Sequence, residues 1–226
     1  MVSRQLSPLR KISLISLLIV VLVSVIYYIK SPFLNKDALV QEVESALTTQ
    51  NVRQLSRVLT SSDEDLIINE HNTQILMDYL QKNPESTESL LTVLQEQSRY
   101  FDLEVSQKRP EQSRIQGFLT LKKNSNTWMP DYYSIEIDPV YLKIHTNSKD
   151  ATLLVNGEQV VKATEPVYEK TIGPLLPGEY QVQAILKQND KHLVEQKQVV
   201  LWNSDEEIRL NLNSDEVGFH VSKQDK

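Results

Sequence analysis

The segment LLVNGEQVV (Leu153–Val161) places the pair Asn156 and Gly157 between two short apolar runs. Asn-Gly is a preferred pair for the two-residue turn that joins antiparallel strands, because both central positions of that turn need a positive φ angle. The segment therefore predicts a tight β-hairpin, and it indicates that this half of the chain is built from strands.

Further strand patterns flank the hairpin on both sides. Apolar and polar residues alternate over Tyr133–Asp138, Val140–Thr146, Tyr180–Leu186 and Ile208–Leu212. Pro139 separates the first two of these segments, since proline lacks the N–H that a central strand position donates. Short strands at this regular spacing predict a small, immunoglobulin-like β-sandwich over residues 139–213, followed by a polar tail over 214–226.

Glycine usage marks where the strand-rich half begins. All five glycines lie between Gly117 and Gly218, and none occurs in the first 116 residues. Glycine favours turns and destabilises helix interiors, so the shift predicts helices first and a turn-rich architecture afterwards. The segments that we expect to form turns are Lys122–Asn126, Gly173–Gly178 and Gln188–Lys191.

Four short amphipathic helices are predicted between residues 37 and 100, where apolar residues recur at helical spacing. Asn51 is a candidate N-cap, and Asn83 followed by Pro84 indicates the end of one helix and the start of the next. Helices this short are not stable alone, so we expect them to pack together in a helical α+β module over residues 35–138. The acidic cluster Asp63–Asp65 is expected to be a solvated helix start rather than a calcium site.

An uncharged run of 18 residues, ISLISLLIVVLVSVIYYI (Ile12–Ile29), precedes the helical part. As a helix it spans about 27 Å, close to the roughly 30 Å hydrocarbon core of a bilayer. We therefore predict one transmembrane helix over residues 12–29 and a linker over 30–34. A cleaved signal peptide is the alternative, but the run is long for one and ends without a small-residue cleavage site.

The charges beside this run predict its orientation. Residues 1–11 carry three basic residues and no acidic one, whereas the whole chain has a formal net charge of −6. Basic flanks stay in the cytoplasm, so residues 1–11 are predicted to be a cytoplasmic tail and the C-terminal part to be extracellular. The residues expected at the membrane interface of this single-pass plasma-membrane protein are Arg10, Lys11, Tyr27, Tyr28 and Lys30.

Composition restricts the chemistry that the chain can perform. The absence of cysteine excludes disulfides, thiolate catalysis and Cys-ligated zinc, and the acidic balance argues against nucleic acid as a partner. The four histidines stand singly, and the chain contains none of the common nucleophile, zinc or phosphate-binding motifs. We therefore predict no enzymatic activity and no cofactor; an enzyme with a dispersed site is the less favoured alternative.

The densest aromatic stretch is WMPDYY (Trp128–Tyr133). Tryptophan and tyrosine are common both in cores and at binding surfaces, and we favour a core role for Trp128 and Tyr133. In the alternative, Trp128 and Tyr132 form a stacking platform for an envelope ligand, and these two are the candidate ligand-binding residues. The basic pairs Lys108–Arg109 and Lys122–Lys123 are expected to be solvated rather than to bind anionic polymers.

The order of these segments resembles the TcaA-type proteins, which are teicoplanin-resistance-associated membrane proteins of Gram-positive bacteria. The helical part is similar to the first extracellular domain of that family, and the segments after residue 130 are similar to its join with the next, β-rich domain. The resemblance covers roughly residues 10–215. The segments that carry it are LTSSDEDLIIN (Leu59–Asn69), Tyr79–Leu80, Asn83–Pro84, DYYSI (Asp131–Ile135), PVYLK (Pro139–Lys143) and Asn156–Gly157.

This resemblance implies a single-pass envelope protein linked to cell-wall physiology and glycopeptide susceptibility. Family members typically begin with a cytoplasmic zinc ribbon and continue into further C-terminal domains, and this chain is expected to lack both. We expect an extracellular binding or scaffold protein of the Gram-positive envelope, with the bilayer and cell-wall precursors, glycopeptides or envelope proteins as partners. The alternative is a structural spacer or assembly partner of another envelope protein, without a small ligand.

Overall fold

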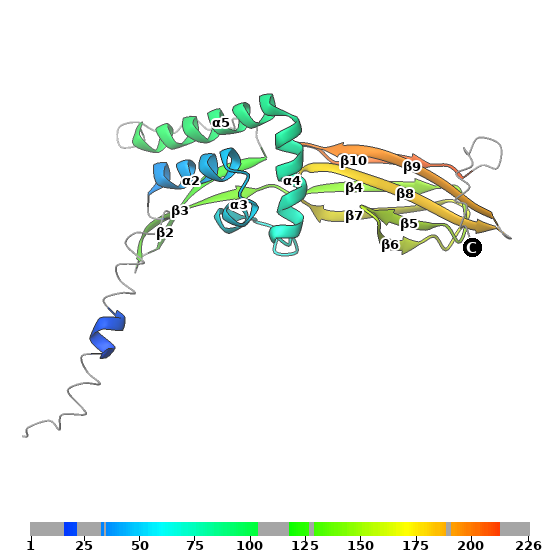
Figure 1. Cartoon of the computed structure of the whole chain (residues 1–226), viewed down its shortest axis with the longest axis horizontal. Coiled ribbons are helices and arrows are strands. Elements are labelled where there is room, and N and C mark those ends of the chain that lie inside the picture. Colours follow the sequence, from blue (N-terminus) through cyan, green and yellow to red (C-terminus); the bar gives the residue numbers. More distant parts are fainter. Residues whose placement is uncertain are drawn as a thin grey trace, which may run out of the picture.

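The computed structural model describes residues 16–21, 33, 35–103, 118–126, 129–188 and 191–212. Helices come first along the chain and most strands follow (Figure 1). The helices with the first three strands lie at one end of an elongated molecule, and the remaining strands lie at the other. The α+β class predicted from the sequence is confirmed. We call α2–α5 with β1–β3 the helical module, and β4–β10 the sandwich.

Only a short piece of the apolar N-terminal run is described. Residues 16–21 are helical, and the side chains of Leu17–Val21 are each more than half exposed. No helix within the described ranges is both long and apolar enough to cross a membrane. The predicted tails at 1–11 and 214–226 lie outside the described residues, as do the predicted interface residues Arg10, Lys11, Tyr27, Tyr28 and Lys30.

Asparagine side chains begin three of the four helices of the helical module. These helices are α2 (Lys36–Thr48), α3 (Val52–Val58), α4 (Glu70–Lys82) and α5 (Pro84–Leu103). The side chain of Asn51 accepts a hydrogen bond from the backbone N–H of Gln54, which confirms the predicted N-cap. Asn83 ends α4 and Pro84 is the first residue of α5, as the sequence predicts.

A three-stranded sheet completes the helical module. Its strands are, in spatial order, β1 (Leu59–Thr60), β3 (Met129–Ile137) and β2 (Leu119–Asn126). The prediction of a turn over Lys122–Asn126 is wrong, because these residues form the second half of β2. Their polar side chains are accommodated by cross-strand partners: Lys122 pairs with Glu136, and Lys123 pairs with Asp131 at 2.8 Å.

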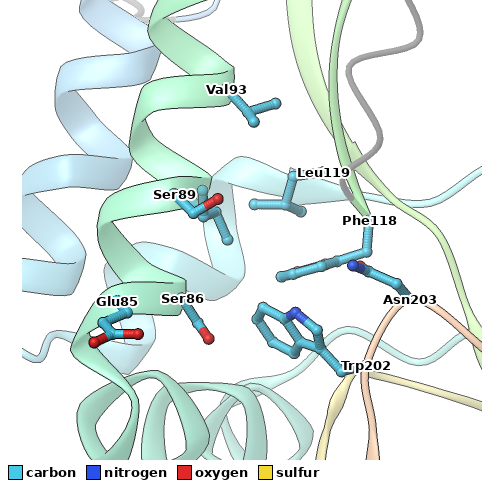
Figure 2. Close-up of a pocket in the computed structure, with 9 residues that line it drawn as sticks. Glu85, Ser86, Ser89, Val93, Phe118, Leu119, Trp202 and Asn203 are labelled. Atoms are coloured by element: carbon cyan, nitrogen blue, oxygen red, sulfur yellow. The ribbon is translucent and has the colours of Figure 1, made fainter.

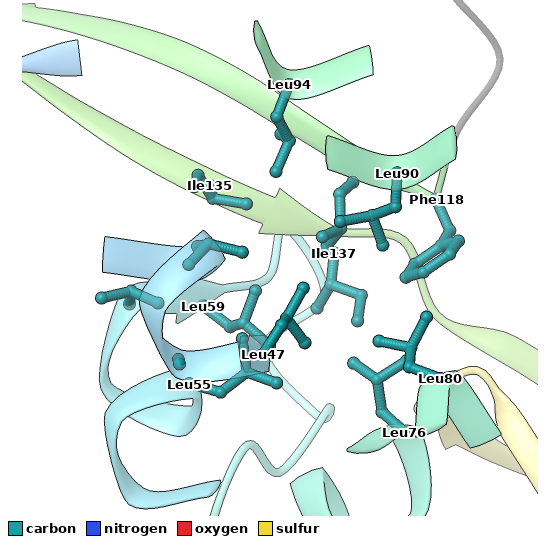
Figure 3. Packing of buried hydrophobic residues seen from close by; sticks show 14 of the residues in the cluster. Leu47, Leu55, Leu59, Leu76, Leu80, Leu90, Leu94, Phe118, Ile135 and Ile137 are labelled. Carbon is teal, nitrogen blue, oxygen red and sulfur yellow. The ribbon is translucent and has the colours of Figure 1, made fainter. Parts of the chain in front are cut away.

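The core of the helical module lies between the helices and β3. Ile135 and Ile137 are fully buried, and leucines from all four helices surround them. Figure 3 shows this packing, with Leu55, Leu76 and Leu94 approaching the strand from three different helices. The four short helices are therefore held by a shared apolar cluster, as their individual instability requires.

The sandwich consists of two sheets that enclose a second apolar cluster. One sheet has the order β10 (Glu206–Leu210), β4 (Val140–Thr146) and β7 (Tyr168–Leu175). The other has the order β6 (Glu158–Lys162), β5 (Thr152–Val155), β8 (Gly178–Gln188) and β9 (Lys191–Leu201). Alternate residues face the cluster, including Leu142 and Ile144 from the first sheet and Leu153 and Val182 from the second.

The predicted hairpin is confirmed, since Asn156 and Gly157 have φ angles of 50° and 82° and connect β5 to β6. The strand order nevertheless differs from that of an immunoglobulin domain. There the second and third strands lie in different sheets, whereas β5 and β6 pair within one sheet here. The turn between β7 and β8 is also shorter than the predicted segment Gly173–Gly178, because Gly173 lies in β7 and Gly178 begins β8.

Removal of a core side chain from β3 should destabilise the protein strongly. Ile135→Ala leaves a cavity at a fully buried position, and we expect it to lower the free energy of unfolding by about 2–5 kcal/mol. Ile67→Ala is the matched control, because Ile67 is 63% exposed and the same change there should cost about 0.5 kcal/mol or less. Urea denaturation measures both, and equal losses would contradict the assignment of the core.

Candidate functional site

The helical module and the sandwich exchange apolar side chains where they meet. Helix α4 stands across the end of the sandwich (Figure 1), and its Ile75 packs against the sandwich cluster. In the opposite direction, Leu176 of the sandwich belongs to the cluster of the helical module, and Trp202 packs against that cluster. The two cores therefore interlock, and we call this region the junction.

The backbone of β8 lies directly against α4 at the junction. A Cβ atom on Gly178 would lie 2.7 Å from Cγ2 of Ile75 and 3.2 Å from its carbonyl oxygen, so the approach depends on the absence of a side chain. Beside this contact, Lys82 at the end of α4 pairs with Glu179 of β8 at 2.6 Å. The two modules are thus held together by the close packing of α4 on β8 and by an ion pair at the exposed edge of this contact.

A second polar contact crosses the junction at Tyr141 of β4. Its hydroxyl donates a hydrogen bond to the carboxylate of Asp63 at 2.8 Å, and its backbone N–H donates to Asp205, also at 2.8 Å. The bond to Asp63 raises the pKa of the Tyr141 hydroxyl; partial burial and the negative charges of Asp63, Asp205 and Asp65 raise it further.

The expectation that Asp63–Asp65 is a helix start is wrong. Helix α4 begins only at Glu70, and the acidic cluster lies in the loop before it. One carboxylate oxygen of Asp63 accepts from the backbone N–H of Asp65, and the other accepts from Tyr141. Asp63 therefore has a structural role at the junction, which the pattern of neighbouring residues in the sequence does not reveal.

Trp202 lies at the centre of the junction, in the loop between β9 and β10. Its ring lies 4.6 Å from the ring of Tyr79 on α4, tilted by 35°, and 4.3 Å from that of Phe118 in an edge-to-face arrangement at 65°. The next residue, Asn203, has a φ angle of 64°, a conformation that asparagine adopts more readily than most residues. The chain thus turns sharply after the tryptophan.

A pocket of about 240 Å³ opens beside Trp202, between the start of α5 and the loop that follows β9. Figure 2 shows Glu85, Ser86 and Ser89 on one side of it, and Phe118, Trp202 and Asn203 on the other. The residues that line it are Glu85, Ser86, Ser89, Leu90, Val93, Phe118, Leu119, Trp202 and Asn203. We call it the junction pocket, and it is the candidate functional site.

The polar groups of the junction pocket are available to a ligand. Within the described part of the chain, the side chains of Glu85, Ser86, Ser89 and Asn203 make no hydrogen bond, and neither does the indole N–H of Trp202. Glu85 and Asn203 are exposed, whereas Trp202 is half-buried. Aromatic surface and unpaired hydrogen-bonding groups therefore meet at one hollow, as is common in small-molecule sites.

The two residues predicted from the sequence as ligand-binding are not in this pocket. Trp128 lies outside the described residues. Tyr132 is 42% exposed and pairs with Asn124, near the end of the β2–β3 hairpin that lies away from Phe118. Tyr133 is half-buried, with its ring 5.8 Å from that of Phe101. Of the two basic pairs, Lys108–Arg109 lies outside the described residues.

These features define a two-module α+β protein with an interlocked junction. Residues 36–137 match the model of the TcaA protein second domain, and residues 138–212 match the model of the TcaA protein 3rd/4th domain. The chain belongs to the TcaA family, which confirms the resemblance seen in the sequence.

One relative is the uncharacterized membrane protein YvbJ of Bacillus subtilis (strain 168). It is 26% identical over 195 residues, which cover 86% of this chain and 30% of the relative. The chain thus matches less than a third of the length of that protein.

The contact between Tyr141 and Asp63 should be visible in a titration. Asp63→Asn removes the negative charge beside the hydroxyl, so the pKa of Tyr141 should fall toward its ordinary value of 10.0. Because the folded-state pKa is raised, the stabilisation linked to this hydroxyl is present below pH 10 and is lost as the pH rises through the folded value.

The chain has nine tyrosines, so the measurement is the difference in absorbance titration between each protein and the same protein carrying Tyr141→Phe. Glu64→Gln is the control, because the Glu64 side chain is exposed in the same loop and makes no bond to Tyr141. An unchanged Tyr141 titration in Asp63→Asn would show that the two side chains do not meet.

Proposed function

We propose that this chain is a membrane-anchored, extracellular binding or scaffold protein of the Gram-positive cell envelope, linked to cell-wall homeostasis and glycopeptide susceptibility and without catalytic activity. Membership of the TcaA family and similarity to a membrane protein support the location. The uncharged run Ile12–Ile29 supports an anchor, and so does the exposure of the apolar side chains of Leu17–Val21, because such surface is stable in lipid rather than in water.

The observation that carries the proposal is the interlocked junction. Two modules that share side chains in both cores present one fixed surface, and the junction pocket lies on it. A preorganised surface of this kind favours binding, because the protein loses little conformational freedom when a partner docks. The partners that we propose are the lipid bilayer and cell-wall precursors, glycopeptides or other envelope proteins, and not nucleic acid.

A second candidate function is that of a structural spacer or assembly partner without a small ligand. The outer face of β9 favours it, because Val194 and Val200 are 39% and 44% exposed there. Exposed apolar side chains on a sheet are suited to contact with another protein. Ligand binding and assembly are distinguished by the retention experiment below.

The proposed topology predicts a simple labelling result. The chain contains no cysteine, so Ser7→Cys and Ser204→Cys each introduce a single reactive thiol. In intact cells an impermeant maleimide should label Ser204→Cys and not Ser7→Cys, since the basic N-terminal side stays in the cytoplasm. Permeabilised cells, in which both positions should react, are the control. Labelling at position 7 alone, or at neither position in intact cells, would contradict an extracellular C-terminal part.

The binding function predicts retention on envelope ligands. Full-length protein in detergent should be enriched on beads that carry lipid-linked cell-wall precursors or a vancomycin-type glycopeptide. The control is a chain whose residues 35–213 are replaced by an unrelated soluble domain behind the same anchor. Enrichment over this control supports a binding protein. Equal recovery of both chains would exclude the ligand function and leave the spacer.

A further inference from the structure

The junction pocket disfavours anionic ligands. Among the described residues that line it, none is basic, and Glu85 is the only one of them with a formal charge. A phosphate or carboxylate group entering the pocket would lose water without gaining a cationic partner from these residues, and it would be repelled by Glu85. The carboxylate of Glu85 also occupies the first turn of α5, where the positive end of the helix dipole would otherwise attract an anion.

The two sides of the pocket require a ligand with two kinds of surface. The half-buried Trp202 offers aromatic surface, and it is bordered by the half-buried Val93 and by the buried Phe118 and Leu90. The opposite side offers the hydroxyls of Ser86 and Ser89 and the carboxylate of Glu85, none of which has a hydrogen-bond partner among the described residues. A matching ligand therefore has an apolar face and hydroxyl donors at its edge.

A sugar ring has this combination. Its C–H groups form an apolar face that covers an aromatic ring, while its equatorial hydroxyls point outward and donate hydrogen bonds. A hydrogen bond from a hydroxyl to a carboxylate is roughly twice as strong as one between neutral groups, which gives Glu85 a specific role. The pocket volume of about 240 Å³ is below the roughly 300–1,000 Å³ of drug-sized sites, so it suits one ring rather than a whole oligomer.

We propose that the junction pocket binds one neutral sugar ring of a longer glycan, against the ring of Trp202 and with its hydroxyls bonded to Glu85 and Ser86. This inference rests on the proposed function, for which it names the ligand class. It also assigns the site to residues from both modules, because Glu85 and Ser86 belong to α5 and Trp202 follows β9.

Trp202 provides the signal for the test. The chain has two tryptophans, so full-length protein carrying Trp128→Phe has Trp202 as its only one. Fluorescence of this protein is titrated with a β-1,4-linked trimer of N-acetylglucosamine, with glycerol phosphate as an anionic probe and with trilysine as a cationic probe. We expect a saturable change with the saccharide alone. Saturation with trilysine but not with the trimer would show a cation site and overturn the proposal.

Glu85→Gln localises the binding. It keeps the size of the side chain but removes the charge that strengthens the hydrogen bond, so the affinity for the trimer should fall about tenfold or more. Glu88→Gln is the matched control, since Glu88 is exposed on the same helix and does not line the pocket. Thermal unfolding should show both variants folded; Glu85→Gln should melt slightly below the parent, because it loses the favourable charge at the start of α5. Equal affinity in Glu85→Gln and the parent, or no saturable change with millimolar trimer, would overturn the proposal.

The same variants separate this inference from the proposed function. If Glu85→Gln is retained on envelope ligands as well as the parent chain, the pocket is not the site and the binding function stands. If the trimer binds at Trp202 while no envelope ligand retains the chain, the pocket binds sugar and the ligands proposed for the whole protein are wrong.

Discussion

The structure depends on the exchange of apolar side chains between two cores. Ile75 of the helical module reaches the sandwich cluster, and Leu176 and Trp202 of the sandwich reach the helical cluster. Close-packed interiors do not deform continuously, so this exchange fixes one arrangement of the modules. The polar contacts around it, Tyr141 with Asp63 and Lys82 with Glu179, join groups that the packing has already brought together.

Local patterns predicted the local structure well. The hairpin at Asn156 and Gly157 and the N-cap at Asn51 each depend on a conformation or a bond within a few residues, which a short segment determines. The polar segment Lys122–Asn126 shows where this fails. Its strand is stabilised by partners on β3, and no property of the segment itself indicates that they will lie opposite.

The candidate site could not be predicted in the same way. Glu85, Phe118 and Trp202 come from three distant parts of the sequence, and the packing of α4 against β8 and of α5 against α4 and β2 brings them to one pocket. Aromatic density along the chain pointed instead to Trp128 and Tyr132, and the second of these lies away from the pocket. The signal available in the sequence was a lone tryptophan outside that aromatic stretch, and its meaning depends on the fold.

The position of the covalent connection between the modules has a separate consequence. The chain passes from one module to the other only at Asp138 and Pro139, whereas the junction is closed by residues as distant as Ile75 and Trp202. After a single proteolytic cut at that connection, the two fragments would be joined only by the non-covalent contacts of the junction, as two separate chains are at an interface between subunits.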